Sequence, residues 1–228
     1  MKWILRLLNS SIGQKLIMSL TGIFLVLFLI VHLSGNLQLL AHDNGESFNI
    51  YAAFMSHNLF IRIISIGLYS FILLHAIQGL ALYFTNRKSK GPYSSRGKVE
   101  GADWPARSMA LLGILIFAFL LLHMGDFWWK MRFTDSLPLI TYPGHDKPVE
   151  DIYSRVHIAF QQLWIVIAYL VGVIALAFHL VHGFQSAFQT LGLNHKKYTP
   201  LIKGIGWIYS ILFPLGFAIL PLYHYFNL

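Results

Sequence analysis

The chain has 228 residues, of which 56% are hydrophobic and only 11% are charged. Soluble globular proteins carry about 25% charged residues, so this composition excludes an ordinary soluble domain. The absence of cysteine excludes disulfides, thiolate-bound iron–sulfur clusters, thiolate zinc sites and covalently attached haem, whereas eleven histidines are candidates for holding a cofactor.

Five long stretches of the sequence lack charged residues, and each can cross a bilayer. A hydrocarbon core of about 30 Å needs roughly 20 helical residues, and helices satisfy their own backbone groups in lipid. We predict an all-α integral membrane bundle, one domain over residues 1–228. Its five transmembrane helices are expected at about 16–41, 59–86, 107–129, 156–190 and 203–226.

The first helix is expected to stay in the protein, and the fourth is expected to extend beyond lipid depth. The first apolar run is too long for a signal peptide, and no small-residue cleavage site follows it. Glutamines lie near both ends of the fourth stretch, so its part at lipid depth should be Leu163 to Phe184.

Lysine and arginine are distributed unequally between the two sides that these helices define. Twelve of the seventeen cations fall on the side of the N-terminus and five on the other side, which also holds seven of the nine acids. Because positively charged loops stay in the cytoplasm, we predict a cytoplasmic N-terminus and an outside C-terminus. The net charge of +8 therefore reflects topology, and no nucleic-acid partner is expected. The basic loop from Lys88 to Ala106 either only fixes this topology or also meets anionic lipid or an acidic partner protein.

Four histidines lie at lipid depth, one on each of the first four predicted helices. They are His32 in FLIVHLSGN, His75 in FILLHAIQG, His123 in FLLLHMGDF and His179 in LAFHLVHG. A single intramembrane histidine can simply hydrogen-bond a neighbouring helix, but four on consecutive helices favour a bound cofactor. No Asp, Glu, Lys or Arg accompanies them at depth, which speaks against a proton relay or an ion path. The sequence also lacks the H-E-x-x-H motif of zinc proteases.

Depth along the helices sorts these four histidines into two levels. His32 and His123 lie 17 and 16 residues past the last cation before their helices, or about 25 Å at 1.5 Å per residue. His75 and His179 lie on helices that run the other way, and both fall in the inner half of the membrane. Two levels with two histidines each are the arrangement that holds two haems by bis-imidazole ligation. Such irons pass electrons and do not bind oxygen.

Small residues near two of the histidines would leave room for a flat macrocycle. Gly79 follows His75 by four residues and Gly183 follows His179 by four, so each glycine lies on the same face as its histidine. His182 shares a near face with His179 and is its main rival as the inner ligand, so spacing alone leaves both open.

The whole chain resembles the cytochrome b membrane-anchor subunit of succinate:quinone oxidoreductases, of the five-helix, two-haem type that includes fumarate reductase anchors. The resemblance is carried by GIFLVLFLIVHLSGN, YSFILLHAIQGLALYF, LLLHMGDFW and FHLVHGFQSAFQTLG, one per helix in the family's order. It implies that His32 and His123 ligate the outer haem iron and that His75 and His179 ligate the inner one. The first histidine of F-H-x-x-[NH]-G is the ligand in that family, which favours His179.

The resemblance further implies a subunit of a succinate dehydrogenase or fumarate reductase in the bacterial inner membrane, and not an enzyme alone. A flavoprotein subunit and an iron–sulfur subunit would dock on the cytoplasmic face. Electrons would pass between them and a quinone, menaquinone rather than ubiquinone, through the two b-type haems. The sequence agrees in one respect, because a chain without cysteine or a nucleotide motif cannot collect electrons from succinate alone.

The resemblance also suggests a contact for an inner-haem propionate. Ser19 matches a position that makes this contact in relatives, and Lys15, Arg107 and Lys196 are nearby cations of the right sign.

The quinone site is the least determined feature. Quinone chemistry needs a proton donor or acceptor close to an electron carrier, in an apolar cleft. His42, Asp43 and Glu46 follow the first helix near the outer haem and are the candidates. The two-haem fumarate reductases have an acid on the second helix there, which this sequence lacks, so the three can equally be ordinary polar loop residues.

Two other classes of function remain open at this point. A haem-b subunit of another respiratory complex, such as a formate dehydrogenase or hydrogenase, would also show intramembrane histidine pairs, with different helix placement. A transporter or structural membrane protein would use the histidines for hydrogen bonds between helices.

Overall fold

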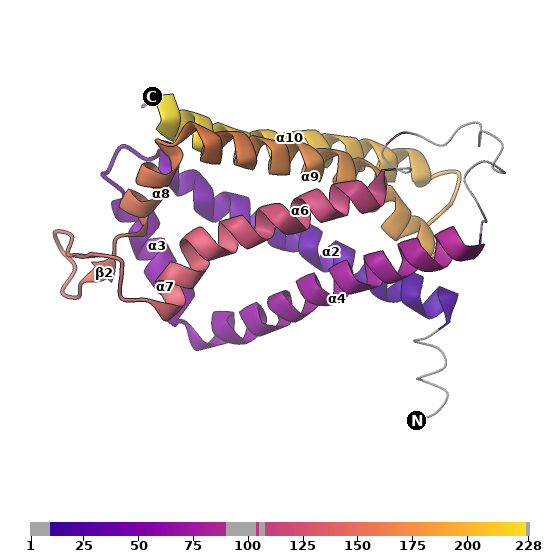
Figure 1. The fold of residues 1–228 in the computed structure, drawn as a ribbon, viewed down its shortest axis with the longest axis horizontal. Helices are drawn as coiled ribbons and strands as arrows, with labels where there is room; N and C mark the ends of the chain where they lie inside the picture. The colour runs from indigo at the N-terminus through magenta and orange to yellow at the C-terminus, as the bar shows by residue number, and fades with distance from the viewer. Residues whose placement is uncertain (1–9, 90–103, 105–107, 227–228) are drawn as a thin grey trace.

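The structure is a computed structural model that describes residues 10–89, 104 and 108–226. Five of its helical segments are long and apolar enough to cross a membrane, which confirms the predicted all-α membrane bundle. Figure 1 shows them running along the long axis of the molecule. Their helices are α2 (Ser11–Asn36), α4 (Leu59–Ser89), α6 (Met109–His123), α9 (Leu163–Thr190) and α10 (Thr199–Phe226).

The outward faces of these helices carry large apolar side chains. Ile66 on α4 and Ile208 on α10 are each 66% exposed, and Leu212 is 60% exposed. Apolar surface of this extent is unfavourable in water and normal against lipid tails. The chain is therefore a multi-pass membrane protein.

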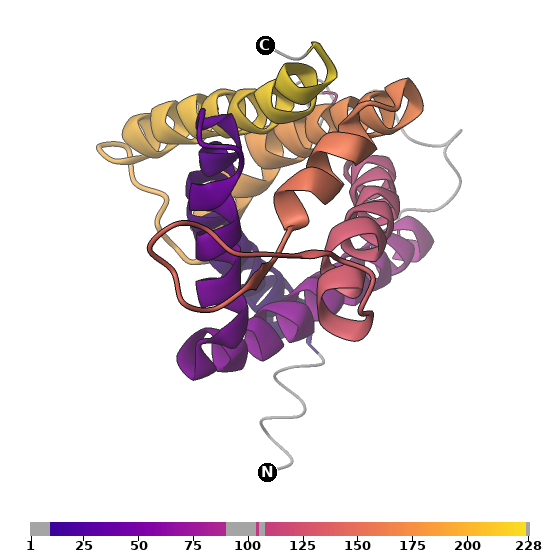
Figure 2. The ribbon, with the colours of Figure 1, turned by 90° about the vertical axis from the view of Figure 1, so that its left-hand side faces the viewer.

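The five long helices surround a common axis, as the end-on view in Figure 2 shows. Helix α9 packs against α2, α6 and α10, and α4 packs against α2 and α6. The contact between α9 and α6 requires a glycine, because a Cβ at Gly172 would overlap the ring of Phe119, 2.5 Å from its Cγ. Glycine at helix contacts allows the close approach that packing in a membrane relies on.

One end of the bundle carries a small cap, which consists of α3 (Glu46–His57), a two-stranded hairpin and α8 (Ile152–Phe160). The hairpin pairs β1 (Leu139–Ile140) antiparallel with β2 (Val149–Glu150). Asn49 of α3 is fully buried where α3 meets the hairpin and α8. Its Nδ2 donates to Tyr142 Oη at 2.8 Å and to Asp151 Oδ1 at 2.9 Å, and its Oδ1 accepts from the Tyr153 amide at 2.8 Å. One side chain thus ties α3 to the hairpin and to α8.

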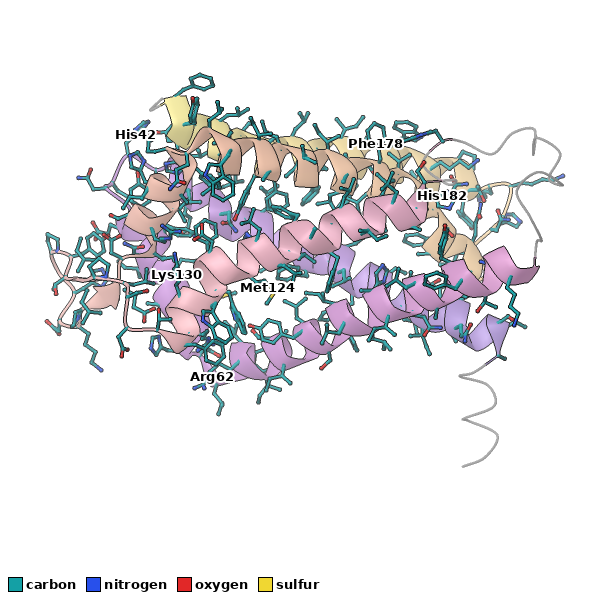
Figure 3. All side chains as sticks on the ribbon, in the orientation of Figure 1. His42, Arg62, Met124, Lys130, Phe178 and His182 are labelled. Carbon is teal, nitrogen blue, oxygen red and sulfur yellow. The ribbon has the colours of Figure 1, made fainter. Side chains whose placement is uncertain are left out.

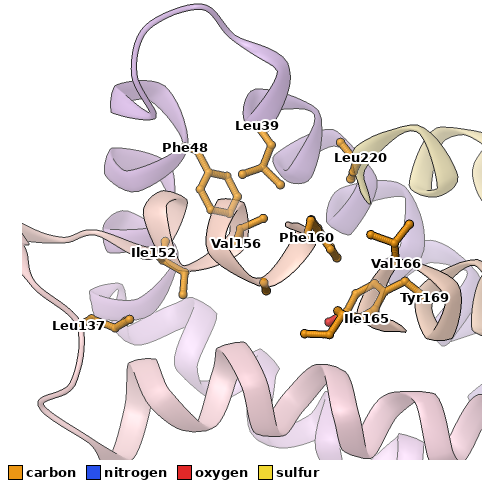
Figure 4. Close-up of a cluster of buried hydrophobic side chains, with 11 residues drawn as sticks. Leu39, Phe48, Leu137, Ile152, Val156, Phe160, Ile165, Val166, Tyr169 and Leu220 are labelled. Atoms are coloured by element: carbon orange, nitrogen blue, oxygen red, sulfur yellow. The ribbon is translucent and has the colours of Figure 1, made fainter. Parts of the chain in front are cut away.

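The main cluster of buried apolar side chains lies beneath this cap (Figure 4). It joins residues of α3 and α8 to the cap-side ends of α9 and α10, so the cap and the bundle share one core. Its members are Leu39, Phe48, Leu137, Ile152, Val156, Ala159, Phe160, Ile165, Val166, Tyr169 and Leu220.

Three features of the fold differ from the sequence-based prediction. The fourth predicted helix is interrupted at Gln161 and Gln162, where Gln162 has an extended backbone and the Gln161 side chain donates to the carbonyl of His224 at 2.6 Å. The third span continues beyond its predicted end, through a π-helical turn, η3 (Met124–Trp128), into α7 (Trp129–Phe133). Helix α3 was not predicted. After α2, a short 3₁₀ turn, η1 (Leu37–Leu40), leads toward α3.

Candidate functional site

The four intramembrane histidines form two facing pairs inside the bundle. The ring of His32 on α2 lies 5.7 Å from the ring of His123 on α6, and the ring of His75 on α4 lies 6.2 Å from that of His179 on α9, measured between ring centroids. These are the pairs expected from depth along the sequence. Each pair joins two helices that are not consecutive in the chain.

The spacing within each pair matches two imidazoles on opposite sides of one metal ion. An imidazole nitrogen lies about 2.0 Å from a metal ion and about 1.1 Å from its own ring centre, so two axial rings have centres about 6 Å apart. Two ring planes that share such an axis can be rotated about it, which accommodates the observed interplanar angles of 85° and 65°. Among the hydrogen bonds of the described residues, none joins the two rings of either pair.

Three of the four rings have a polar side-chain atom within hydrogen-bonding distance of Nδ1, and at two of them, His75 and His123, that atom is a hydroxyl that can accept the Nδ1 proton. Thr21 Oγ1 lies 3.1 Å from His75 Nδ1, and it donates its own proton to a backbone carbonyl of α2. Tyr169 Oη lies 3.3 Å from His123 Nδ1. At His32 the neighbour of Nδ1 is the side-chain Nδ2 of Asn36 at 3.3 Å, which is a donor and also donates to the His32 carbonyl at 2.7 Å, so it does not accept a proton from this ring. A partner at one ring nitrogen is the usual way in which proteins orient a metal-ligating histidine.

The ring of His179 differs, because its Nδ1 is buried and has no hydrogen-bond partner among the described residues. His182 lines the same cavity, but the ring that faces His75 is that of His179. Figure 3 shows His182 toward the end of the bundle away from the cap.

A large cavity contains both pairs. Its volume is about 2050 Å³, and all four histidines line it. Sites for a single small molecule typically measure about 300–1,000 Å³, so this space can take two large planar groups. Residues of α3 in the cap, among them Tyr51 and Ser56, close it at one end.

Glycines leave space in this cavity beside His75 and His179. Of the two glycines predicted to do so, Gly79 and Gly183, only Gly183 lies beside its histidine. A Cβ added at Gly22 would lie 3.4 Å from His75 Cε1, and one at Gly183 would lie 3.9 Å from His179 Cδ2. A Cβ at Gly79 would instead meet the methyl group of Met18 at 3.0 Å. The absence of side chains at these positions fits a flat group held between the rings.

Two of the four residues expected at an inner propionate lie at the end of this cavity away from the cap. Ser19 and Lys15 both line it. Ser19 is buried, and its hydroxyl donates to the Lys15 carbonyl at 2.9 Å. Lys196 lies on the exposed turn before α10. Arg107 lies outside the described residues, as do residues 90–103 of the basic loop.

The three residues expected at a quinone site, His42, Asp43 and Glu46, lie at the start of the cap and do not line the cavity. Asp43 accepts hydrogen bonds from the amides of Gly45 and Ser47, and hydrogen bonding from Ser47 lowers the pKa of its carboxyl. Glu46 lies 3.9 Å from His145, and His42 is exposed at the cap end (Figure 3). In this structure the Asp43 carboxylate therefore binds backbone amides at the start of α3.

The sequence did not predict a charged cluster inside the third span. Asp126, three residues after His123, forms ion pairs with Arg155 of α8 and, at 3.1 Å, with Lys130. The Asp126 side chain is only 13% exposed. The predicted helix, 107–129, already contained Asp126, and the span continues to Phe133; its ion pair with Arg155 joins residues 29 positions apart.

In the described part of the chain, no group of three or more His, Cys, Asp or Glu side chains is placed to hold a metal ion. Two axial histidines are sufficient only where a macrocycle supplies the remaining ligands. No family model, curated protein or solved structure matches this chain.

Proposed function

We propose that the chain is a two-haem cytochrome b of the membrane, the anchor subunit of a succinate:quinone oxidoreductase. The observation that carries this proposal is the presence of two histidine pairs, at 5.7 and 6.2 Å between rings, in one cavity inside the bundle. Intramembrane ionisable residues are costly and mark functional sites by default. Four of them arranged in two facing pairs have the ligand number and spacing of two bis-imidazole irons.

The side chains have distinct roles in holding the two haems. His32 and His123 would provide the axial nitrogens of one, and His75 and His179 those of the other. Thr21 and Tyr169 fix ring orientation through Nδ1, while Gly22 and Gly183 leave space beside the rings. With both axial positions filled, a b-type haem carries one electron at a time and has no open position for oxygen.

Apolar side chains form most of the lining of this cavity. The apolar residues of five helices surround the cavity, and the cap covers one end of it. Lys15 at the opposite end supplies a cation of the kind that carboxylate groups of a haem require, and the Ser19 hydroxyl could donate to such a group in place of the Lys15 carbonyl. These features orient the two groups along the bundle axis, so that electrons could cross the membrane interior.

Partner subunits complete the proposed enzyme. The chain has no cysteine for iron–sulfur clusters, so it depends on another protein to oxidise succinate or reduce fumarate. We propose that a flavoprotein and an iron–sulfur subunit dock on the cytoplasmic side of the bacterial inner membrane, and that a quinone, menaquinone before ubiquinone, exchanges electrons with the haems. The alternative is a haem-b subunit of another respiratory complex, such as a formate dehydrogenase or hydrogenase.

Two measurements test this proposal. A reduced-minus-oxidised spectrum of the purified chain should show the α band of low-spin b-type haem at two haems per chain. A spectrum without an α band would refute haem binding and leave histidine hydrogen bonding between helices as the explanation. Co-purification from the native membrane should then recover a flavoprotein with succinate dehydrogenase or fumarate reductase activity. Recovery of a formate dehydrogenase or a hydrogenase would favour the alternative.

A further inference from the structure

Tyr169 of α9 carries the hydroxyl that lies beside His123 of the first pair. The side chain is 6% exposed and belongs to the buried cluster of Figure 4. Its ring packs edge-on against Phe119, Phe127 and Phe160, at 5.0, 6.2 and 4.9 Å between ring centroids. These rings offer the hydroxyl no good hydrogen bond, so its contact with His123 Nδ1 at 3.3 Å defines its role.

The direction of this hydrogen bond follows from ligation. A histidine that binds iron through Nε2 keeps its proton on Nδ1, so Tyr169 Oη must accept that proton. The hydroxyl then needs an acceptor for its own proton, and the hydrogen bonds of the described residues include none that provides it. A buried donor without an acceptor is costly, so a second partner is expected close to Tyr169.

Asp126 has a carboxylate oxygen that lacks a donor. Its Oδ1 accepts from Arg155 and Lys130, whereas Oδ2 is buried and has no hydrogen-bond partner among the described residues. The carboxylate interacts electrostatically with the Tyr169 hydroxyl, as does the Arg155 guanidinium. An ionised carboxylate oxygen is a strong acceptor of a hydroxyl proton.

Tyr169 and Asp126 reach the first pair from two different elements. Helix α9, which carries Tyr169, packs against α6, which carries His123. Asp126 follows His123 by three residues, in the π-helical turn η3. Phe127, its neighbour in the chain, packs against both His123 and Tyr169, at 5.7 and 6.2 Å between ring centroids. Single π turns within α-helices occur frequently at functional sites.

The second pair has different surroundings. Thr21 Oγ1 can accept the Nδ1 proton of His75, but it donates its own proton to the neutral carbonyl of Ile17 at 2.8 Å. His179 Nδ1 is buried and has no hydrogen-bond partner in the described part of the chain. The hydroxyl beside the second pair therefore bonds to a neutral group, whereas the one beside the first pair lies in the field of a carboxylate.

We propose that Tyr169 and Asp126 are positioning residues that lower the reduction potential of the haem held by His32 and His123, an inference that rests on the proposed function. The Tyr169 hydroxyl accepts the Nδ1 proton of His123 and donates its own proton to Asp126 Oδ2, directly or through one water molecule.

The effect on the potential follows from ligand basicity. An acceptor at Nδ1 makes the axial imidazole a stronger electron donor, and a hydroxyl that itself donates to a carboxylate is a stronger acceptor. Both changes favour the oxidised, more positive iron, so they lower its reduction potential. Arg155 and Lys130 balance the charge of Asp126, which therefore acts mainly through the hydroxyl.

A potentiometric titration of the full haem-loaded chain in nanodiscs tests this inference. Tyr169→Phe should raise the equilibrium constant for reduction of one component about tenfold, or about 59 mV for a one-electron couple. That component is the one that His123→Ala removes, and the other should not move. Asp126→Asn should shift the same component in the same direction by a smaller factor, about threefold.

Two matched controls separate these shifts from general effects. Thr21→Val removes the corresponding hydroxyl from His75, so it should move only the other component. Asp135→Asn removes an exposed negative charge just beyond α7 and should move neither component.

The double variant Tyr169→Phe/Asp126→Asn distinguishes a connected pair from two separate effects. If Asp126 acts through the hydroxyl, the double variant should match Tyr169→Phe alone, at about tenfold. Independent effects would instead multiply to about thirtyfold.

Unchanged potentials in Tyr169→Phe, equal shifts of both components, or a multiplied effect in the double variant would overturn the inference. Loss of the haem in both single variants would make the two residues structural and would also overturn it. Haem content of the wild type reports separately on the proposed function. Two haems whose potentials do not depend on Tyr169 refute the inference alone, whereas a wild type without an α band refutes the proposed function itself.

Discussion

Replacing Asn49 should loosen the cap while leaving the bundle intact. Asn49 is fully buried and makes three hydrogen bonds, to Tyr142, Asp151 and the amide of Tyr153. Each intramolecular hydrogen bond contributes about 0.5–1.5 kcal/mol, and a bond to a charged group contributes about 1.5–3 kcal/mol. Asn49→Ala should therefore destabilise the closed cap by about 3 kcal/mol.

Hydrogen exchange of the α3 amides measures this change locally, because sub-global opening of one unit is reported by the amides of that unit. A loss of about 3 kcal/mol corresponds to exchange about a hundredfold faster in Asn49→Ala, since about 1.4 kcal/mol is a factor of ten. Tyr142→Phe removes only one of the bonds and should accelerate exchange about fivefold. Amides in the middle of α9 should be unaffected in both variants. Unchanged α3 exchange in Asn49→Ala, or equal effects of the two substitutions, would refute the network as the main tie of the cap.

Three further predictions concern the histidine pairs and the start of the cap. Gly22→Leu should remove one of the two haem components in a redox titration, because a side chain there enters the space beside His75; retention of both would mean that this space is not used. His182→Asn should keep two haems per chain, and loss of one would make His182 a ligand. Hydrogen bonding from Ser47 lowers the pKa of Asp43 in the folded cap. The ionised Asp43 carboxylate therefore contributes fully to cap stability above its unfolded pKa of about 4. This contribution is lost as the pH falls through the lower pKa of the folded state. Exchange of the α3 amides should therefore accelerate below about pH 4 more in the wild type than in Asp43→Asn, and identical profiles would contradict this.

The membrane spans could be predicted because length and hydrophobicity alone specify them. A bilayer imposes one dimension on every helix, so counting residues from the helix ends placed His32 level with His123 and His75 level with His179 without any knowledge of the packing. The structure brings the same rings together. Whether they bind haem stays a prediction.

The cap could not be predicted, because its stability comes from contacts between distant residues. Asn49 and Tyr142 are 93 positions apart, and neither has a local signal that points to the other. Helix α3 mixes apolar and polar residues in a short segment, which does not distinguish a helix from a loop between two spans.

The rotation of each helix about its own axis could not be predicted from the sequence either. A spacing of four residues correctly placed Gly183 near His179, but the same spacing at Gly79 gave a contact with Met18. Gly22, which faces His75 from another helix, has no sequence signal at all. The ion pair between Asp126 and Arg155 was not predicted, because the two residues are 29 positions apart and lie on different helices.

The most direct test of the central proposal is a potentiometric titration of the haem spectrum in four single alanine variants. If each facing pair holds one iron, every variant should lose one of two components. His32→Ala and His123→Ala should lose the same one, and His75→Ala and His179→Ala should lose the other. Loss of the same component in His32→Ala and His75→Ala would contradict the pairing, and the absence of any haem component in the wild type would contradict the account as a whole.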